Sequence, residues 1–99
     1  MDDLEPEALN ERFAIRDQLS FKDGPSGFPA AMITNGHASV TVLLYGGHVT
    51  SYQPTGYEEL LWVSRQAIYK PDNAIRGGIT ICWPWFADHP TDPSKPAHG

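Results

Sequence analysis

Residues 30–53 read AAMITNGHASVTVLLYGGHVTSYQ, and this stretch decides the fold. Between residues 37 and 45 the side chains alternate between two sets, one made of Ala38, Val40, Val42 and Leu44 and the other of Ser39, Thr41, Leu43 and Tyr45. A period of two is typical of a β-strand. We therefore predict a strand with one buried face here.

The flanking segments predict an antiparallel sheet. Residues 30–34 precede the strand across Asn35-Gly36, the dipeptide that most favours a type I′ hairpin turn. Gly46-Gly47 separates the strand from a second alternating run, residues 48–53, and allows either a tight hairpin or a bend at a sheet corner; we favour the corner. A turn then leads into residues 59–63, predicted to be another strand that pairs with 48–53.

The two ends of the chain have other patterns. Residues 2–13 predict a short helix, because Asp at the start, Pro6 in the first turn and several carboxylates suit the positive end of the helix dipole. Leu4, Leu9 and Phe13 would form its apolar side. Residues 71–99 contain five prolines and Gly77-Gly78, so we expect them to be mainly irregular. The predicted fold class is all-β and antiparallel, with at least three strands in residues 29–63 and a short N-terminal helix.

Charge and composition exclude several classes of function. The formal charge of −5 comes from five carboxylates before residue 12, and the remainder is balanced. There is no basic patch for nucleic acid, and no apolar run approaches the roughly 20 residues that span a bilayer. The first residues do not have the pattern of a signal peptide, and the single Cys82 cannot form an internal disulfide. We expect a cytoplasmic protein without nucleic-acid or membrane partners.

The segment AIRGGITICWPWF, residues 74–86, indicates the functional site. Arg76 lies between an isoleucine and two glycines, and Trp83, Trp85 and Phe86 follow as an aromatic wall. A guanidinium among apolar residues and aromatic rings is typical of a pocket of sugar size. Cys82 is most simply a small apolar residue.

An ordered set of motifs carries a family resemblance. It comprises YGGHV at 45–49, QP at 53–54, LLW at 60–62, AIRGGI at 74–79, CWPWF at 82–86 and PAHG at 96–99. In this order they resemble the N-terminal part of the hexose-6-phosphate mutarotases (glucose-6-phosphate 1-epimerases), relatives of aldose 1-epimerase. The resemblance implies an antiparallel β-sandwich of the galactose mutarotase-like supersandwich type. Residues 1–99 would be the N-terminal portion of one such domain, about the first third of a family member, truncated after Gly99.

The same resemblance implies interconversion of the α and β anomers of a hexose 6-phosphate, without metal or organic cofactor. The family's catalytic carboxylate and histidine come later in its chains and have no counterpart in residues 1–99, so no catalytic residue is assigned here. Arg76 and His98 match substrate-site residues, although the arginine that follows in the family's His-Gly-X-X-Arg segment is absent. Trp85 and Phe86 would face the ligand, or else belong to the hydrophobic core. The chain alone is expected to be inactive.

Two other classes of function remain open at this stage. One is a non-catalytic carbohydrate-binding β-sandwich, in which Trp62, Trp83 and Trp85 stack on sugar rings. The other is a metal-dependent β-barrel enzyme, whose ligands would be His37, His48, Asp88, His89 and His98. The spacing of these residues disfavours it, because no His-X-His or His-X3-His pair occurs. We also expect self-association through exposed sheet edges.

Overall fold

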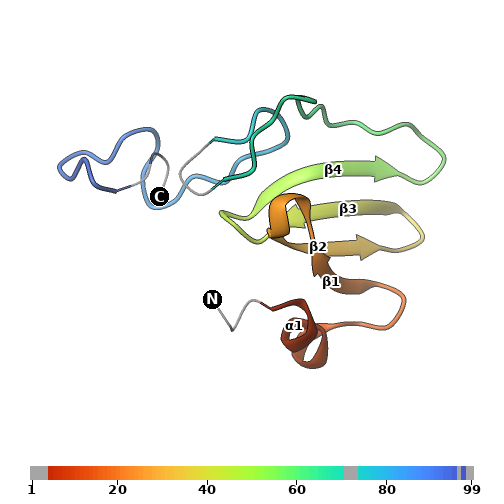
Figure 1. Ribbon diagram of the computed structural model, residues 1–99. Helices are drawn as coiled ribbons and strands as arrows, with labels where there is room; N and C mark the ends of the chain where they lie inside the picture. The colour runs from red at the N-terminus through yellow and green to blue at the C-terminus, as the bar shows by residue number, and fades with distance from the viewer. Residues whose placement is uncertain (1–4, 71–73, 96, 98–99) are drawn as a thin grey trace.

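The computed structural model describes residues 5–70, 74–95 and 97. Helix α1 (Pro6–Phe13) is followed by the strands β1 (Leu19–Asp23), β2 (Pro29–Thr34), β3 (Ala38–Leu43) and β4 (His48–Pro54), with a 3-10 turn, η2 (Pro25–Gly27), after β1. The strands form one antiparallel sheet in the order β1-β2-β3-β4 (Figure 1). The described residues beyond β4 add no further helix or strand. These findings confirm the all-β antiparallel class, the three strands within residues 29–63 and the irregular structure of the described part of 71–99.

Helix α1 covers the outer edge of β1. Pro6 lies at the start of the helix, and Leu9 is its buried residue. The side-chain amide of Asn10 donates to the Phe21 carbonyl at 2.8 Å, and its carbonyl oxygen accepts from the Phe21 amide at 2.7 Å. A side chain thus occupies a main-chain position where another strand could otherwise pair. Of the predicted apolar side, Phe13 is exposed and Leu4 lies outside the described residues.

Residues 35–37 form the β2–β3 connection, but the turn is not of type I′. That turn needs positive φ at both central residues, and none of Asn35, Gly36 and His37 has it. Instead, the Asn35 side chain accepts hydrogen bonds from the amides of His37 and Ala38, at 2.7 and 3.1 Å. The predicted hairpin is present, and the side chain of Asn35 closes it.

The Gly46-Gly47 pair makes a hairpin turn between β3 and β4, so the predicted sheet corner is wrong. Leu43 pairs with His48 across the turn, and both glycines have positive φ, 74° and 63°. Left-handed backbone at two successive positions costs glycine little. The chain can therefore reverse here and continue the same sheet.

The core lies on the face of the sheet that carries Leu43, which is completely buried. Ala30, its cross-strand partner on β2, and Ile75 from the later chain complete the buried cluster. Partly buried side chains pack around the cluster: Phe28, Met32, Val63, Ala67 and Tyr69. The alternation in β3 predicts one buried face, but Ala31 on the neighbouring β2, which pairs with Val42, is buried on the opposite face. The sheet therefore buries residues on both faces.

Residues 59–63 do not form the predicted strand. The Glu59 carboxylate accepts a hydrogen bond from the Ser51 hydroxyl, one from the Tyr52 amide at 2.7 Å and one from the Leu61 amide at 3.0 Å. Only the Leu60 amide reaches β4, at the Tyr52 carbonyl. A side chain thus takes amides that a strand ladder would use. This contact covers part of the outer edge of β4 and leaves less free edge for the self-association expected from the sequence.

Candidate functional site

Arg76 lies on a short segment that is held between two other parts of the chain. Its carbonyl accepts from the Ser64 amide at 2.8 Å, and the Gly78 amide donates to the Trp62 carbonyl, also at 2.8 Å. On the other side, Ile79 and Val49 exchange two hydrogen bonds, of 2.8 and 3.0 Å. Residues 76–79 are therefore held by backbone hydrogen bonds to residues 62–64 on one side and to the start of β4 on the other.

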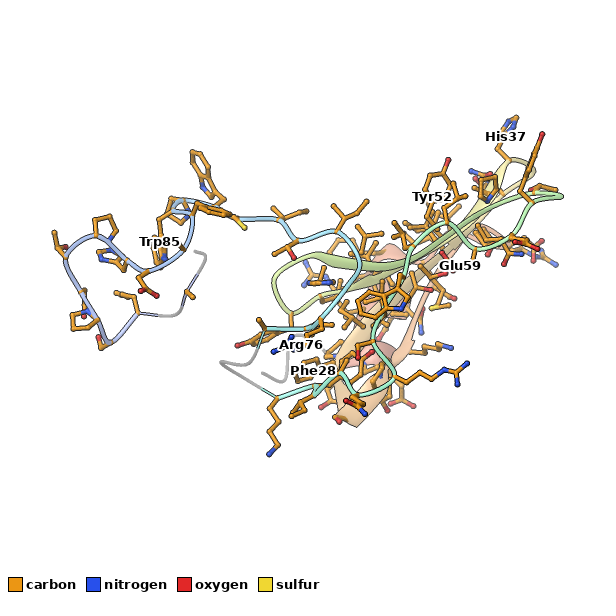
Figure 2. All side chains as sticks on the ribbon, turned by 90° about the horizontal axis from the view of Figure 1, so that it is seen from above. Phe28, His37, Tyr52, Glu59, Arg76 and Trp85 are labelled. Atoms are coloured by element: carbon orange, nitrogen blue, oxygen red, sulfur yellow. The ribbon has the colours of Figure 1, made fainter. Side chains whose placement is uncertain are left out.

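The side chains on this segment alternate between core and solvent. Ile75 is 9% exposed and belongs to the cluster around Leu43, whereas Arg76 is exposed. Burial of the isoleucine anchors the backbone immediately before the arginine. The guanidinium thus remains accessible to a ligand while its backbone is attached to the core (Figure 2).

Gly77 and Gly78 allow close packing at this point. Their φ angles are 114° and 72°, a region that disfavours other residues. A Cβ at Gly77 would lie 2.5 Å from the Val63 Cα, and one at Gly78 would lie 2.9 Å from the His48 Nε2. The Gly78 amide is already bonded to the Trp62 carbonyl and is not free to bind a ligand. The glycines thus serve close approach of the backbone.

His48 is a site residue that the sequence did not predict. It is 7% exposed at the start of β4, and its Nε2 lies 2.6 Å from the Gly77 carbonyl oxygen. The signal for it was present in the sequence, because a histidine that directly follows Gly46-Gly47 begins a strand next to a turn. The sequence pattern indicates His48 only as a candidate metal ligand.

The aromatic residues of the motif lie apart from Arg76. Figure 2 shows Arg76 beside the sheet and Trp85 on a loop that projects away from it; Figure 1 draws this loop in blue. Phe86 is 78% exposed and Trp83 is 77% exposed, so neither belongs to the core of this structure. Trp85 is half-buried, with its ring edge-on to His89 at a centroid distance of 4.5 Å. The described residues therefore bring together Arg76, the two glycines and His48, without the aromatic wall.

Other candidate features are placed as follows. His98 lies outside the described residues. Within residues 5–70, 74–95 and 97, no three His, Cys, Asp or Glu side chains are grouped so that they could hold a metal ion. No helix in the same ranges is long and apolar enough to cross a bilayer. A cavity of about 260 Å³ lies by β1 and β2, between Ile15 and Thr34, and is not lined by Arg76.

Glu59 is the second residue that the sequence analysis did not single out. Its hydrogen bond from the Ser51 hydroxyl, followed by those from the Leu61 and Tyr52 amides, lowers the pKa of its carboxyl below the ordinary value. Desolvation opposes this effect. The carboxylate is thus held in its charged form at the β4 edge, where it joins residues 59–61 to the sheet.

Known proteins are similar to this chain in sequence and, for a solved structure, in fold. A protein of Escherichia coli (strain K12) named "Putative glucose-6-phosphate 1-epimerase" is 46% identical over 56 residues, 57% of this chain and 19% of its own. One of the same name from Cenchrus ciliaris is 46% identical over 66 residues, 66% of this chain and 20% of its own. The crystal structure of YeaD from Salmonella typhimurium, described as "a putative mutarotase", superposes with a TM-score of 0.69 at 31% identity.

These matches cover only a part of each relative. The YeaD comparison covers 87% of this chain and 28% of that one. Of the two curated relatives, the chain spans about a fifth of the length. The sequence model of the Aldose 1-epimerase family matches residues 29–99, which include the whole of the Arg76 segment. The resemblance predicted from the motifs is thus confirmed: this chain belongs to the aldose 1-epimerase family.

Proposed function

We propose that this chain supplies the phosphate-binding side of the substrate site in an enzyme that interconverts the anomers of a hexose 6-phosphate. The observation that carries the proposal is the exposed Arg76 guanidinium on a backbone anchored by the buried Ile75. A guanidinium offers paired, planar donors that match two phosphate oxygens, and it keeps its charge when partly desolvated. The names of the curated relatives support glucose 6-phosphate as the hexose phosphate.

The reaction needs one base and one acid. The base removes the proton from the anomeric hydroxyl while the acid protonates the ring oxygen, so that the bond between C1 and the ring oxygen breaks and an aldehyde forms. Closure of the ring on the other face of the aldehyde gives the other anomer. In this scheme Arg76 takes no part in proton transfer; it binds the phosphate and thereby orients the sugar.

The 99-residue chain alone is expected to be a poor catalyst. From the family resemblance we expect both proton-transfer groups to lie outside it, and each such group typically contributes about 10² to 10⁴-fold. The measurement is anomer exchange of glucose 6-phosphate, followed by NMR against a buffer blank and the complete E. coli relative. Exchange near the rate of the relative would show that residues 1–99 hold the catalytic groups.

The role of Arg76 is best tested in a chimera that joins residues 1–99 to the later part of the E. coli relative. Arg76→Ala should reduce kcat/KM for glucose 6-phosphate by about 30-fold or more, equivalent to about 2 kcal/mol for a charge-assisted contact. Unphosphorylated glucose should lose much less, because it lacks the phosphate. Arg65→Ala is the matched control, since Arg65 is also exposed but lies on the neighbouring segment.

The two substrates separate a binding role from a structural one. Equal losses for glucose 6-phosphate and glucose would mean that Arg76 supports the fold and does not contact phosphate. Arg76→Lys adds a further check, because lysine keeps the charge but loses the paired donors. A lysine variant with wild-type kinetics would contradict recognition by paired hydrogen bonds.

One observation favours a second candidate, a non-catalytic carbohydrate-binding module. Trp62 and Trp83 expose most of their surface, as rings that stack on sugars would have to do. In that case the chain alone should bind unphosphorylated hexoses, with a change in tryptophan fluorescence that is lost in Trp62→Ala and Trp83→Ala. Binding that requires phosphate and Arg76, in place of these rings, would exclude this function.

A further inference from the structure

His48 is a buried polar side chain that the proposed chemistry does not use. Among the described residues, His48 is the one polar or charged residue that is classed as buried. A polar group buried in a protein needs a hydrogen-bond partner, and the partner of its Nε2 is the Gly77 carbonyl oxygen at 2.6 Å. Because a carbonyl can only accept, the Nε2–H of the imidazole donates.

This hydrogen bond acts on the part of residues 76–79 whose backbone has the most conformational freedom. Backbone hydrogen bonds already hold the Arg76 carbonyl, the Gly78 amide and both polar groups of Ile79. The peptide between Gly77 and Gly78 is flanked by two glycines, whose backbone angles have the widest freedom. His48 fixes the carbonyl of that peptide.

The glycine at position 78 fits this role. A Cβ there would lie 2.9 Å from the His48 Nε2, so that the ring would have to shift, and its contact with Cδ2 at 3.1 Å would also be tight. It would also collide with the Val49 carbonyl oxygen. The absence of a side chain at Gly78 thus lets the imidazole approach the peptide.

We propose that His48 is a positioning residue for Arg76: its hydrogen bond to the Gly77 carbonyl fixes the Gly77–Gly78 peptide, and with it the backbone from which the guanidinium reaches the phosphate. The role in substrate selectivity rests on the proposed function, since Arg76 must contact the phosphate for its position to affect binding. The structural part of the proposal, that His48 orders residues 76–79, is independent of that function.

The structural part is tested by amide hydrogen exchange on the 99-residue chain. His48→Leu removes the donor, so the Ser64, Gly78 and Ile79 amides should exchange about 3- to 10-fold faster, the range for one net hydrogen bond. His48→Gln, which carries an amide donor near the position of Nε2, should restore most of the protection. If the His48→Leu variant does not fold, His48→Asn is used in its place, because the asparagine side chain is too short for its amide to reach the Gly77 carbonyl. The Val40 amide in the sheet interior is the internal reference.

The functional part is tested in the chimera with the E. coli relative. His48→Leu should raise KM for glucose 6-phosphate about 3- to 10-fold, in line with the loss of one hydrogen bond, and leave kcat within about twofold. His48→Gln should return KM towards the wild-type value. Asn10→Ala, at the opposite edge of the sheet, is the control for general destabilisation and should not change KM selectively.

The outcomes distinguish the two proposals. If Arg76→Ala leaves the preference for phosphate unchanged, the proposed function fails, while faster exchange at Gly78 still supports the ordering role of His48. If Arg76→Ala abolishes the preference but His48→Leu changes neither exchange nor KM, the positioning role alone is overturned. Exchange that accelerates equally at Gly78 and Val40, without rescue by His48→Gln, also overturns it.

Discussion

Gly78→Ala should destabilise the chain much more than an alanine at another glycine with the same backbone angle. Gly78 has a φ of 72°, and Gly46 in the β3–β4 turn has a φ of 74°. A Cβ at Gly46 would meet no atom within 4 Å, whereas a Cβ at Gly78 would meet the Val49 carbonyl and the His48 ring. The pair therefore separates the cost of the backbone angle from the cost of the collision.

The magnitude follows from these two terms. Left-handed backbone costs a residue with a Cβ about 1 to 2 kcal/mol, and this applies equally to Gly46→Ala and Gly78→Ala. Forcing a methyl group into an occupied space adds about 1 to 3 kcal/mol, and this applies only to Gly78. The free energy of unfolding should thus fall by about 2 to 5 kcal/mol for Gly78→Ala, which has both costs. For Gly46→Ala it should fall by about 1 to 2 kcal/mol, the cost of the backbone angle alone.

Urea unfolding followed by circular dichroism measures both variants on the same chain. In the chimera, Gly78→Ala should also reduce the preference for glucose 6-phosphate over glucose, because the displaced peptide moves the backbone of Arg76. Gly46→Ala should leave that preference unchanged. Equal destabilisation by the two substitutions would refute the close approach of His48 and Val49 to Gly78.

Three further outcomes follow from the fold. Leu43→Ala should cost about 2 to 5 kcal/mol in urea unfolding, because the side chain is fully buried, while Leu60→Ala at an exposed position should cost little; equal costs would contradict the placement of the core. Asn10→Ala removes both hydrogen bonds to β1 and should cost about 1 to 3 kcal/mol, with faster exchange of the Phe21 amide as the local readout; an unchanged exchange rate would count against the covered edge. The pKa of Glu59 is lowered from 4.5, so its contribution to stability is present above that pH and is lost as the pH falls through the lowered value. Glu59→Gln should therefore be less stable than wild type at about pH 7 and approach it at about pH 2, and a constant difference would contradict the assignment.

The strands could be predicted from the sequence because their signals are local. Alternation and turn glycines predict β2, β3 and β4, and these signals do not depend on the rest of the chain. The depth of burial of Leu43 could not be predicted, because it depends on the return of Ile75 over the sheet from 32 residues later. Residues 59–63 failed as a strand for a related reason. Their hydrophobic pattern favours pairing, but the Glu59 carboxylate takes the amides of Tyr52 and Leu61.

The site was predictable in part, and through a different kind of signal. Arg76 was found because its motif resembles a family, and the structure shows it exposed on an anchored segment. No sequence pattern pairs His48 with Gly77, which lie 29 positions apart and meet only because β4 and residues 76–79 run along the same edge. The roles of Trp85 and Phe86 stay predictions, since the projecting loop that carries Trp85 does not approach Arg76 in the described residues.

The exposure of Arg76 limits how much its guanidinium alone can contribute to phosphate binding. An exposed ion pair contributes only about 0 to 1 kcal/mol, because water competes for both charges and the long side chain loses conformational freedom. Such a contact alone would hold a sugar phosphate far more weakly than the millimolar range, which needs about 4 kcal/mol. The buried Ile75 and the His48 hydrogen bond order the backbone of Arg76 in advance, so that less conformational entropy is lost on binding, but they cannot exclude water from the guanidinium. Strong recognition of the phosphate therefore requires further groups to enclose the guanidinium, and the loop that carries Trp85 projects away from Arg76 in the described part of the chain.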